Sequence, residues 1–164
     1  MIAILKVNWD SNLPIYEISQ SVLQKKEIHS LLIDVDGTLV NRKSNMIPKA
    51  VKNWIRESKE IFSLYLISNN PSKKRIERIA KELNLRYKYN ASKPRKKVTF
   101  SAIKEIGIEP KNIAIIGDRL FTDIIVGNRC NIKTILVKRL NRDGLPIKFN
   151  LTLTIEKLIS YFIK

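Results

Sequence analysis

Five short apolar runs alternate with helical patterns between about residues 31 and 137 of this 164-residue chain. These runs are the expected strands: Leu31–Val35, Phe62–Ile67, Arg86–Tyr89, Ile113–Ile116 and Lys133–Val137. Strands that alternate with helices in this way are typical of βαβ units, in which the strands lie parallel. The sequence therefore predicts an α/β fold with a parallel sheet of about five strands and helices on both faces.

Four helices are expected between these strands. The first begins at Pro48, and the second begins at Asn70 and Pro71, because an N-cap residue followed by proline is typical of a helix start. The third begins near Pro94, and the fourth covers about residues 122–128. Residues at helical spacing are expected to be buried against the sheet: Val51, Trp54, Ile55, Ile76, Ile79, Ala80, Leu83, Phe100, Ile103 and Ile106.

Two flanks surround this core in what we expect to be a single domain over 1–164, with the core at 31–140. Residues 1–30 are expected to contain a helix, and 141–164 form a helical C-terminal flank. That flank carries an apolar stripe at helical spacing: Ile155, Leu158, Ile159 and Phe162. Such a stripe usually covers a sheet edge or face. The alternative is contact with a membrane interface, which the neighbouring Lys157 and Lys164 favour.

The chain is strongly basic, with 31 Lys and Arg against 15 Asp and Glu and a formal net charge of +16. Such a domain attracts polyanions, which could be nucleic acid, an anionic membrane or a multiply phosphorylated small molecule. Its apolar stretches are too short to span a bilayer, and its first residues do not resemble a signal peptide. Cys130 is the only cysteine, which excludes an internal disulfide and favours a reducing cytosolic setting.

Chemically active residue types follow four successive strands. They are the pair Asp34 and Asp36, then Ser68, then Lys93, and finally Asp118 and Asp123 within residues 117–123. Since the carboxyl ends of parallel strands meet at one edge of a sheet, these side chains should meet there. Each piece alone has a structural explanation, such as a surface Asp-Gly turn or a helix cap. The joint order is therefore the informative signal.

In this order the four pieces resemble the four motifs of the haloacid dehalogenase-like (HAD) hydrolases. Residues 117–123 with 127–129, Ser68-Asn69-Asn70, and the pair Lys93 and Pro94 are similar to the YqeG-like branch of HAD subfamily IIIA. That branch includes phosphatidylglycerophosphate phosphatases, and the similarity covers roughly residues 10–140. One departure is Gly37, where many YqeG-like chains carry Asn.

The resemblance implies a role for each matched residue. Asp34 would attack phosphorus and form an aspartyl-phosphate, and Asp36 would act as general acid and base. Ser68, Asn69 and Lys93 would bind the phosphoryl group, and the charge of Lys93 would also assist catalysis. A Mg²⁺ ion would be held by Asp34, Asp118, Asp123 and Asp36, the last through its backbone carbonyl.

The segments between the motifs are too short for a cap domain, so the site should be open to large substrates. Several basic clusters are expected to surround it: Lys73–Arg75, Arg95–Lys97, Arg119, Arg129, Lys138, Arg139 and Arg142. Such a rim would suit an anionic phospholipid headgroup at a membrane. The expected location is the cytoplasm or the cytoplasmic face of a membrane, and no obligate protein partner is expected.

The first hypothesis is a Mg²⁺-dependent phosphatidylglycerophosphate phosphatase of phosphatidylglycerol synthesis. The alternative is a phosphatase of nucleic-acid ends, nucleotides or other small phosphomonoesters, which the charge allows. Against nucleic acid, the chain lacks an obvious surface of interleaved aromatic residues for stacking bases. A phospho-acceptor receiver domain is disfavoured, because its acceptor would lie on a later strand than the acidic pair.

Overall fold

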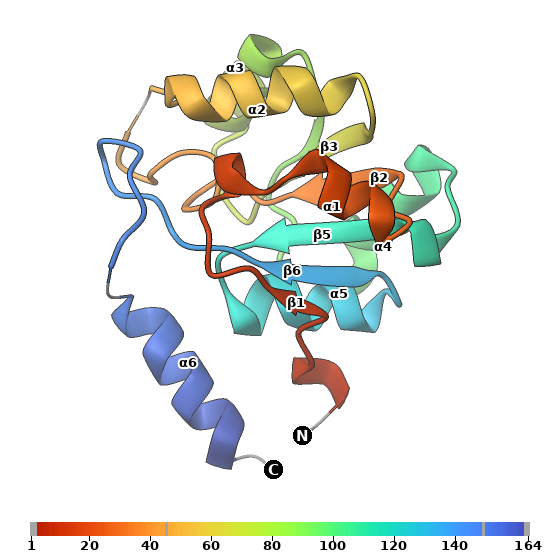
Figure 1. The fold of residues 1–164 in the computed structure, drawn as a ribbon, viewed down its shortest axis with the longest axis vertical. Helices are drawn as coiled ribbons and strands as arrows, with labels where there is room; N and C mark the ends of the chain where they lie inside the picture. Colours follow the sequence, from red (N-terminus) through yellow and green to blue (C-terminus); the bar gives the residue numbers. More distant parts are fainter. Residues whose placement is uncertain (1–2, 45, 149, 163–164) are drawn as a thin grey trace.

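A computed structural model describes residues 3–44, 46–148 and 150–162 (Figure 1). Six parallel strands form one sheet in the order β1-β6-β5-β2-β3-β4. They are β1 (Trp9–Asp10), β2 (Ser30–Ile33), β3 (Ser63–Ile67), β4 (Arg86–Lys88), β5 (Ile113–Gly117) and β6 (Lys133–Leu136). The expected parallel α/β fold is confirmed. The sixth strand, β1, has only two residues, which is too short to show a sequence period.

Helices cover both faces of the sheet, as expected. They are α1 (Gln20–Lys25), α2 (Lys49–Lys59), α3 (Lys73–Leu83), α4 (Lys96–Ile106), α5 (Ile125–Arg129) and α6 (Leu151–Phe162). Short helical turns add η1 (Ala3–Leu5), η2 (Ile15–Glu17), η3 (Pro110–Asn112) and η4 (Leu120–Ile124). Because side chains alternate along a strand, Leu31 and Ile33 pack with α1, α2 and α3, while Leu32 packs with α4 and α5.

Two local predictions about the helices were wrong. Helix α3 begins at Lys73 with Ser72 as its N-cap, because the side chain of Asn70 bonds to Asp36 and to the Ser72 backbone instead. Phe100 was expected to be buried but is 46% exposed. Helix α4 turns its neighbours Thr99, Ala102 and Ile103 toward the sheet, so Phe100 lies on the outer side, near Lys104.

The apolar stripe of the C-terminal flank does not cover the sheet. Helix α6 lies beside the body of the molecule (Figure 1), and Ile155, Leu158 and Ile159 are 40–53% exposed. The helix attaches through its other side, where Leu153 packs near η4 and Glu156 is buried. The favoured prediction of a covering stripe is therefore wrong for these three residues. The side chain of Phe162 and the whole of Lys164 lie outside the described residues.

The carboxyl edge of the sheet has no cap. Between β2 and β3 the described chain forms loops and α2, and between β3 and β5 it forms α3, β4, α4 and η3. None of these segments is a domain-sized insert, so the expected absence of a cap agrees with the described residues. Among all the described residues, no helix is both long enough and apolar enough to cross a bilayer.

Candidate active site

The two central strands bring the first and last motifs together. Strands β2 and β5 are neighbours, with Ile33 paired to Ile116, and the Asp34 N–H donates to the Ile116 carbonyl at 2.9 Å. Asp34 therefore lies beside the strand that leads to Asp118. Carboxylate oxygens of Asp34, Asp118 and Asp123 all lie within 4.8 Å of one another. All three side chains are buried at the edge of a pocket, where the sequence predicted a metal site.

A glycine lets Asp123 approach the end of β5. Gly117 is the last residue of β5, and a Cβ placed on it would lie 2.3 Å from the Asp123 carboxylate. Turn η4 then carries Asp123 back over the strand end, and the Arg119 N–H donates to Asp123 Oδ2 at 3.2 Å. Glycine at position 117 is thus explained by the close packing of Asp123 against the end of β5, within the loop formed by residues 117–123.

Lys93 joins the carboxylates from the loop between β4 and α4. Its Nζ lies 2.7 Å from Asp34 Oδ1 and 2.6 Å from Asp123 Oδ1, and it also donates to the Ile67 carbonyl at 3.1 Å. The side chain is almost fully buried. Burial alone would lower the pKa of Lys93, but the two carboxylates outweigh it and raise the pKa, so the ammonium stays charged.

Asn69 holds the backbone of Lys93 in place. Its Nδ2 donates to the Lys93 carbonyl at 2.8 Å, and its Oδ1 accepts from the Lys93 N–H at 2.7 Å. The side chain of Asn69 is therefore already engaged, and its predicted contact with phosphate stays a prediction. Ser68 also lines the pocket, and its Oγ accepts from the Asn70 N–H at 3.0 Å. The Ser68 hydroxyl keeps its own O–H donor for another acceptor, such as a phosphoryl oxygen.

The nucleophile predicted from sequence is held by two donors. Lys93 contacts Oδ1 of Asp34, and the buried Thr38 hydroxyl donates to Oδ2 at 3.2 Å. Burial raises the pKa of Asp34 to about 6, although Lys93 acts in the opposite direction. The contact of Thr38 with Asp34 was not predicted from the sequence and becomes visible once the turn is folded.

Asp118 is the carboxylate whose surroundings fit a cation best. Neither of its buried oxygens accepts a hydrogen bond from the described residues, although Arg139 Nε forms an ion pair with Oδ2 at 3.0 Å. Burial, followed by the charges of Asp34 and Asp123, raises the pKa of Asp118 well above its usual value. Buried polar atoms normally have partners, and oxygen-only sites suit Mg²⁺. A divalent cation would satisfy both requirements.

Asp36 points away from this carboxylate cluster. One oxygen accepts from Asn70 Nδ2 at 2.7 Å, and the other accepts from Arg75, 2.8 Å from Nη2. Asp36 also lines the pocket, so its carboxyl group lies close enough to the other site residues for its predicted role as general acid. Its predicted metal contact runs through the backbone carbonyl and stays a prediction.

Gly37 sits where no side chain fits. Its φ is +104°, and a Cβ there would lie 2.7 Å from Asp118 Oδ2 and 2.9 Å from Arg139 Nε. Few residues with side chains adopt such a backbone conformation. In this chain the turn after Asp36 is therefore tied to glycine by both its conformation and the approach of Arg139.

Three arginines line the pocket mouth: Arg42, Arg119 and Arg139. The sequence predicted Arg119 and Arg139 among many basic residues around the edge, but it did not single out Arg42. The other predicted clusters, such as Lys73 and Arg95, are not among the residues that line this pocket. The closeness of a basic residue to a motif along the chain was therefore a poor guide to whether its side chain lines the pocket.

Four further residues contribute to the site without having been recognised. Asn70 was interpreted as a helix cap, Arg75 as one basic residue in a cluster, and Arg42 and Glu156 were not considered. Glu156 of α6 accepts from Arg119 and from the Leu120 N–H at 2.8 Å. The signal that could have found Asn70 was its place beside Ser68 at a strand end; Glu156 offered no such signal.

Sequence comparisons identify relatives of this chain. A family model described as HAD-hydrolase-like matches residues 90–143. The probable phosphatase YqeG of Bacillus subtilis is 30% identical over 138 residues, which cover 83% of this chain and 80% of that protein. The glycerol-3-phosphate phosphatase of Rattus norvegicus is 43% identical over 44 residues, covering 27% of this chain and 14% of that protein.

Solved structures with the same fold include two 3-deoxy-D-manno-octulosonate 8-phosphate phosphatases. The putative enzyme from Vibrio cholerae has a TM-score of 0.54 at 15% identity, covering 82% of this chain and 85% of that one. The enzyme from Moraxella catarrhalis has a TM-score of 0.50 at 20% identity, covering 89% and 98%. An uncharacterized protein from Listeria monocytogenes has a TM-score of 0.56 at 18% identity, covering 77% and 86%.

Proposed function

The chain belongs to the HAD-like hydrolases as a HAD-type phosphatase, and we propose that it is a Mg²⁺-dependent phosphatidylglycerophosphate phosphatase working at an anionic membrane surface. The observation that carries the proposal is the buried cluster of Asp34, Asp118 and Asp123, neutralised in part by Lys93. A phosphoric monoester is attacked in such a site by the carboxylate nearest the phosphorus, which we assign to Asp34.

The residues divide the chemistry as follows. Asp34 Oδ forms a bond to phosphorus while the bond from phosphorus to the leaving oxygen breaks, and Asp36 delivers its proton to that oxygen. Asp36 then accepts a proton from water as the water oxygen displaces Asp34 from phosphorus. Lys93 keeps Asp34 oriented, and Ser68 donates to a phosphoryl oxygen.

The cation is proposed to be held by Asp34, Asp118, Asp123 and the backbone carbonyl of Asp36. Mg²⁺ would offset the repulsion between these carboxylates and the phosphate dianion. The unsatisfied oxygens of Asp118 support this assignment. The structural relative from Moraxella catarrhalis was solved with magnesium and phosphate ions, which also supports it.

A second anionic group on the substrate is favoured by the pocket mouth. Arg42, Arg119 and Arg139 line it, in addition to the proposed phosphoryl ligands Ser68 and Lys93, although Arg119 already pairs with Glu156 and Arg139 with Asp118. Phosphatidylglycerophosphate carries a phosphodiester near its terminal phosphomonoester, and arginine binds such groups in a two-pronged way. The open, capless edge allows a headgroup to enter while its acyl chains remain outside.

The surface next to the site suits contact with a lipid bilayer. Helix α6 exposes five large apolar residues: Leu151, Ile155, Leu158, Ile159 and Tyr161. The chain has a net charge of +16, which attracts an anionic bilayer and disfavours a second copy of itself. Glu156 attaches this helix to Arg119 at the pocket mouth, so a lipid-bound α6 would lie beside the substrate.

The test is turnover of three substrates side by side: phosphatidylglycerophosphate in mixed micelles, an oligonucleotide 3′-phosphate and glycerol 3-phosphate. We expect the lipid to give the highest kcat/KM, and EDTA to stop the reaction until Mg²⁺ is restored. Preference for the oligonucleotide would favour the alternative function. Turnover that survives EDTA would contradict the metal assignment.

Membrane contact is tested separately by sedimentation with vesicles. We expect the protein to bind vesicles that contain phosphatidylglycerol and to be released by high salt, because the attraction is electrostatic. Vesicles of phosphatidylcholine alone are the matched control. Equal binding to both, or no binding to either, would remove the membrane from the proposal and leave the phosphatase assignment standing.

A further inference from the structure

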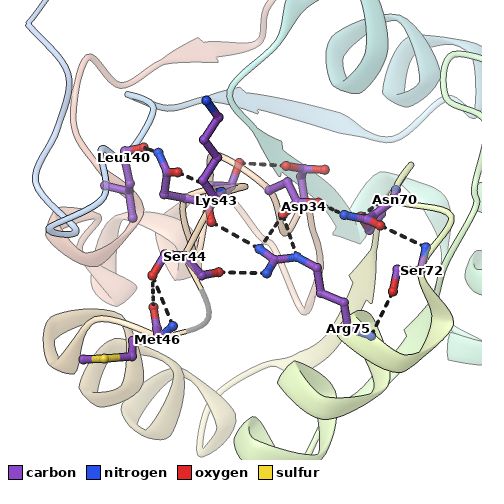
Figure 2. A network of polar contacts seen from close by, with 12 residues as sticks. Asp34, Lys43, Ser44, Met46, Asn70, Ser72, Arg75 and Leu140 are labelled. Atoms are coloured by element: carbon purple, nitrogen blue, oxygen red, sulfur yellow. Dashed lines mark hydrogen bonds and ion pairs between the residues drawn. The ribbon is translucent and has the colours of Figure 1, made fainter.

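The side chain of Arg75 connects three separate parts of the molecule beside the active site (Figure 2). It projects from the first turn of α3 and is only 14% exposed. Its Nε and Nη2 lie 3.3 and 2.8 Å from Asp36 Oδ1. The same guanidinium donates to two backbone carbonyls of the loop after Asp36, at 2.7 Å to Ser44 and 3.1 Å to Asn41. Arg75 is therefore largely shielded from solvent, and these contacts direct its guanidinium.

The other oxygen of Asp36 is held by Asn70. Its Nδ2 donates to Asp36 Oδ2 at 2.7 Å, while its Oδ1 accepts from the Ser72 N–H at 2.9 Å. An aspartate turns about two side-chain bonds, and two donors on opposite oxygens fix both. The planar guanidinium of arginine supplies both a charge and a fixed direction, whereas an ammonium group would supply the charge alone. Asp36 is thus oriented by residues of the segment after β3.

The other carboxylates of the site are held in a different way from Asp36. Asp34 and Asp123 are held by Lys93 inside the cluster, whereas the Asp36 carboxylate accepts hydrogen bonds from Asn70 and Arg75, which lie outside it. A general acid must reach the leaving oxygen, on the far side of phosphorus from the nucleophile. A carboxylate free to rotate could turn toward the proposed cation instead.

We propose that Arg75 and Asn70 are positioning residues that hold the Asp36 carboxyl group toward the leaving oxygen. The inference rests on the proposed function, since it presumes that Asp36 transfers the proton. Arg75 touches neither phosphate nor metal in this assignment; it acts through Asp36. The loop at Asn41 and Ser44 fixes Arg75 in turn, so that the acid keeps its orientation while substrates enter.

The test compares two substrates that differ in their need for an acid. Glycerol 3-phosphate has a poor leaving group that requires protonation, whereas 4-nitrophenyl phosphate releases a stable phenolate without it. We expect Arg75→Gln to lower kcat/KM for glycerol 3-phosphate by about 10- to 100-fold and for 4-nitrophenyl phosphate by less than about 3-fold. kcat/KM is the right quantity because it excludes hydrolysis of the phospho-enzyme.

Three variants complete the experiment. Asp36→Asn should show the same selective loss, and adding Arg75→Gln to it should cost little more, because both changes remove one function. Arg75→Lys retains the charge but not the planar fork, and should restore only part of the rate. Arg78→Gln is the matched control on the same helix, since Arg78 is an exposed partner of Glu82; it should leave both substrates unchanged.

The possible failures are distinguishable. Equal losses on both substrates, or a double variant whose losses multiply, would show that Arg75 is merely structural and would overturn the inference. A selective loss in Asp36→Asn without one in Arg75→Gln and Arg75→Lys would do the same while leaving the proposed function intact. If Asp36→Asn slows both substrates equally, its assigned role and the inference fall together. Arg75→Lys keeps the test valid if Arg75→Gln does not fold.

Discussion

The carboxyl edge of the central strands and helix α6 contain similar sequence signals but behave in opposite ways. On β2 every residue is buried, and the polar groups that follow it bond to partners far away in the chain. On α6 the apolar residues recur at helical spacing, yet Ile155, Leu158 and Ile159 remain exposed. Regular spacing of apolar residues therefore identifies an apolar face, but the surrounding elements decide whether that face is covered.

The two regions meet at one buried carboxylate. Glu156 of α6 is 3% exposed and accepts from the Leu120 N–H and the guanidinium of Arg119. Helix α6 is therefore attached to the loop at residues 117–123 by hydrogen bonds of Glu156 rather than by its apolar stripe. Substitutions in the two regions should therefore have effects of very different size.

The largest effect is expected from the proposed nucleophile. Asp34→Asn should lower phosphate release by about 10³-fold or more, because an amide at this position cannot make the proposed attack on phosphorus. Phosphate release measures the loss, and circular dichroism checks the fold. Asp10→Asn, at the exposed ion pair with Lys157 of α6, is the control that should retain activity. Normal turnover by Asp34→Asn would refute the assigned nucleophile.

The next effect contrasts two lysines. Lys93→Met should reduce the free energy of unfolding by about 3–5 kcal/mol, because it removes the ammonium group that pairs with both buried carboxylates, Asp34 and Asp123. Lys157→Met, at the exposed ion pair of α6, should change it by less than about 1 kcal/mol. Denaturant unfolding in EDTA measures both. Similar losses in the two variants would contradict the contrast between the regions.

The pH dependence of stability should reveal the buried carboxylate. The folded-state pKa of Asp34 is raised to about 6, above its usual value near 4, so the folded protein retains a proton that the unfolded chain has released. The stabilisation is complete below about pH 4 and is lost as pH rises through about 6, a change of about 3 kcal/mol. Unfolding of the metal-free protein across this range measures it. In Asp34→Asn the slope should be smaller, and an unchanged slope would exclude Asp34 as its origin.

The hydrogen bonds that attach α6 are expected to contribute less to stability than the ion pairs of Lys93. Glu156→Ala should reduce stability by about 1–3 kcal/mol, because the Leu120 N–H and Arg119 lose a buried acceptor. Thermal unfolding measures the change, with Glu57→Ala on the outer side of α2 as an exposed control. If Glu156→Ala and the control behave alike, the bonds of Glu156 do not hold the helix.

The smallest effect on folding is expected from the exposed stripe itself. Replacing Leu158 and Ile159 together by serine should alter the free energy of unfolding by less than about 1 kcal/mol, because both are largely exposed. The same variant should lose most of its binding to anionic vesicles, since it removes apolar area from the side of α6 that we propose to contact lipid. Sedimentation with vesicles measures that loss. Strong destabilisation would show instead that the stripe packs against the protein.

Much of the fold could be predicted because each signal was local. The strands after which Asp34, Ser68 and Asp118 lie are short apolar runs, and parallel strands place their ends together. The motif residues did meet at one edge, although the individual roles of Asp36, Asn69 and the others remain predictions, as does the single-domain assignment over 1–164. The start of α3 was wrong because the side chain of Asn70 had a distant partner that no local pattern contains.

The sequence by itself determined the order of five of the six strands and of the helices between them, most of their apolar positions, and the carboxylates and lysine available at the strand ends. These depend on residue type and spacing over a few positions. Only the tertiary structure decided that Arg75 and Asn70 hold Asp36, that three arginines reach the pocket, and that the stripe of α6 stays uncovered. Contacts between residues far apart in the chain depend on how whole elements pack, and spacing along the chain does not encode them.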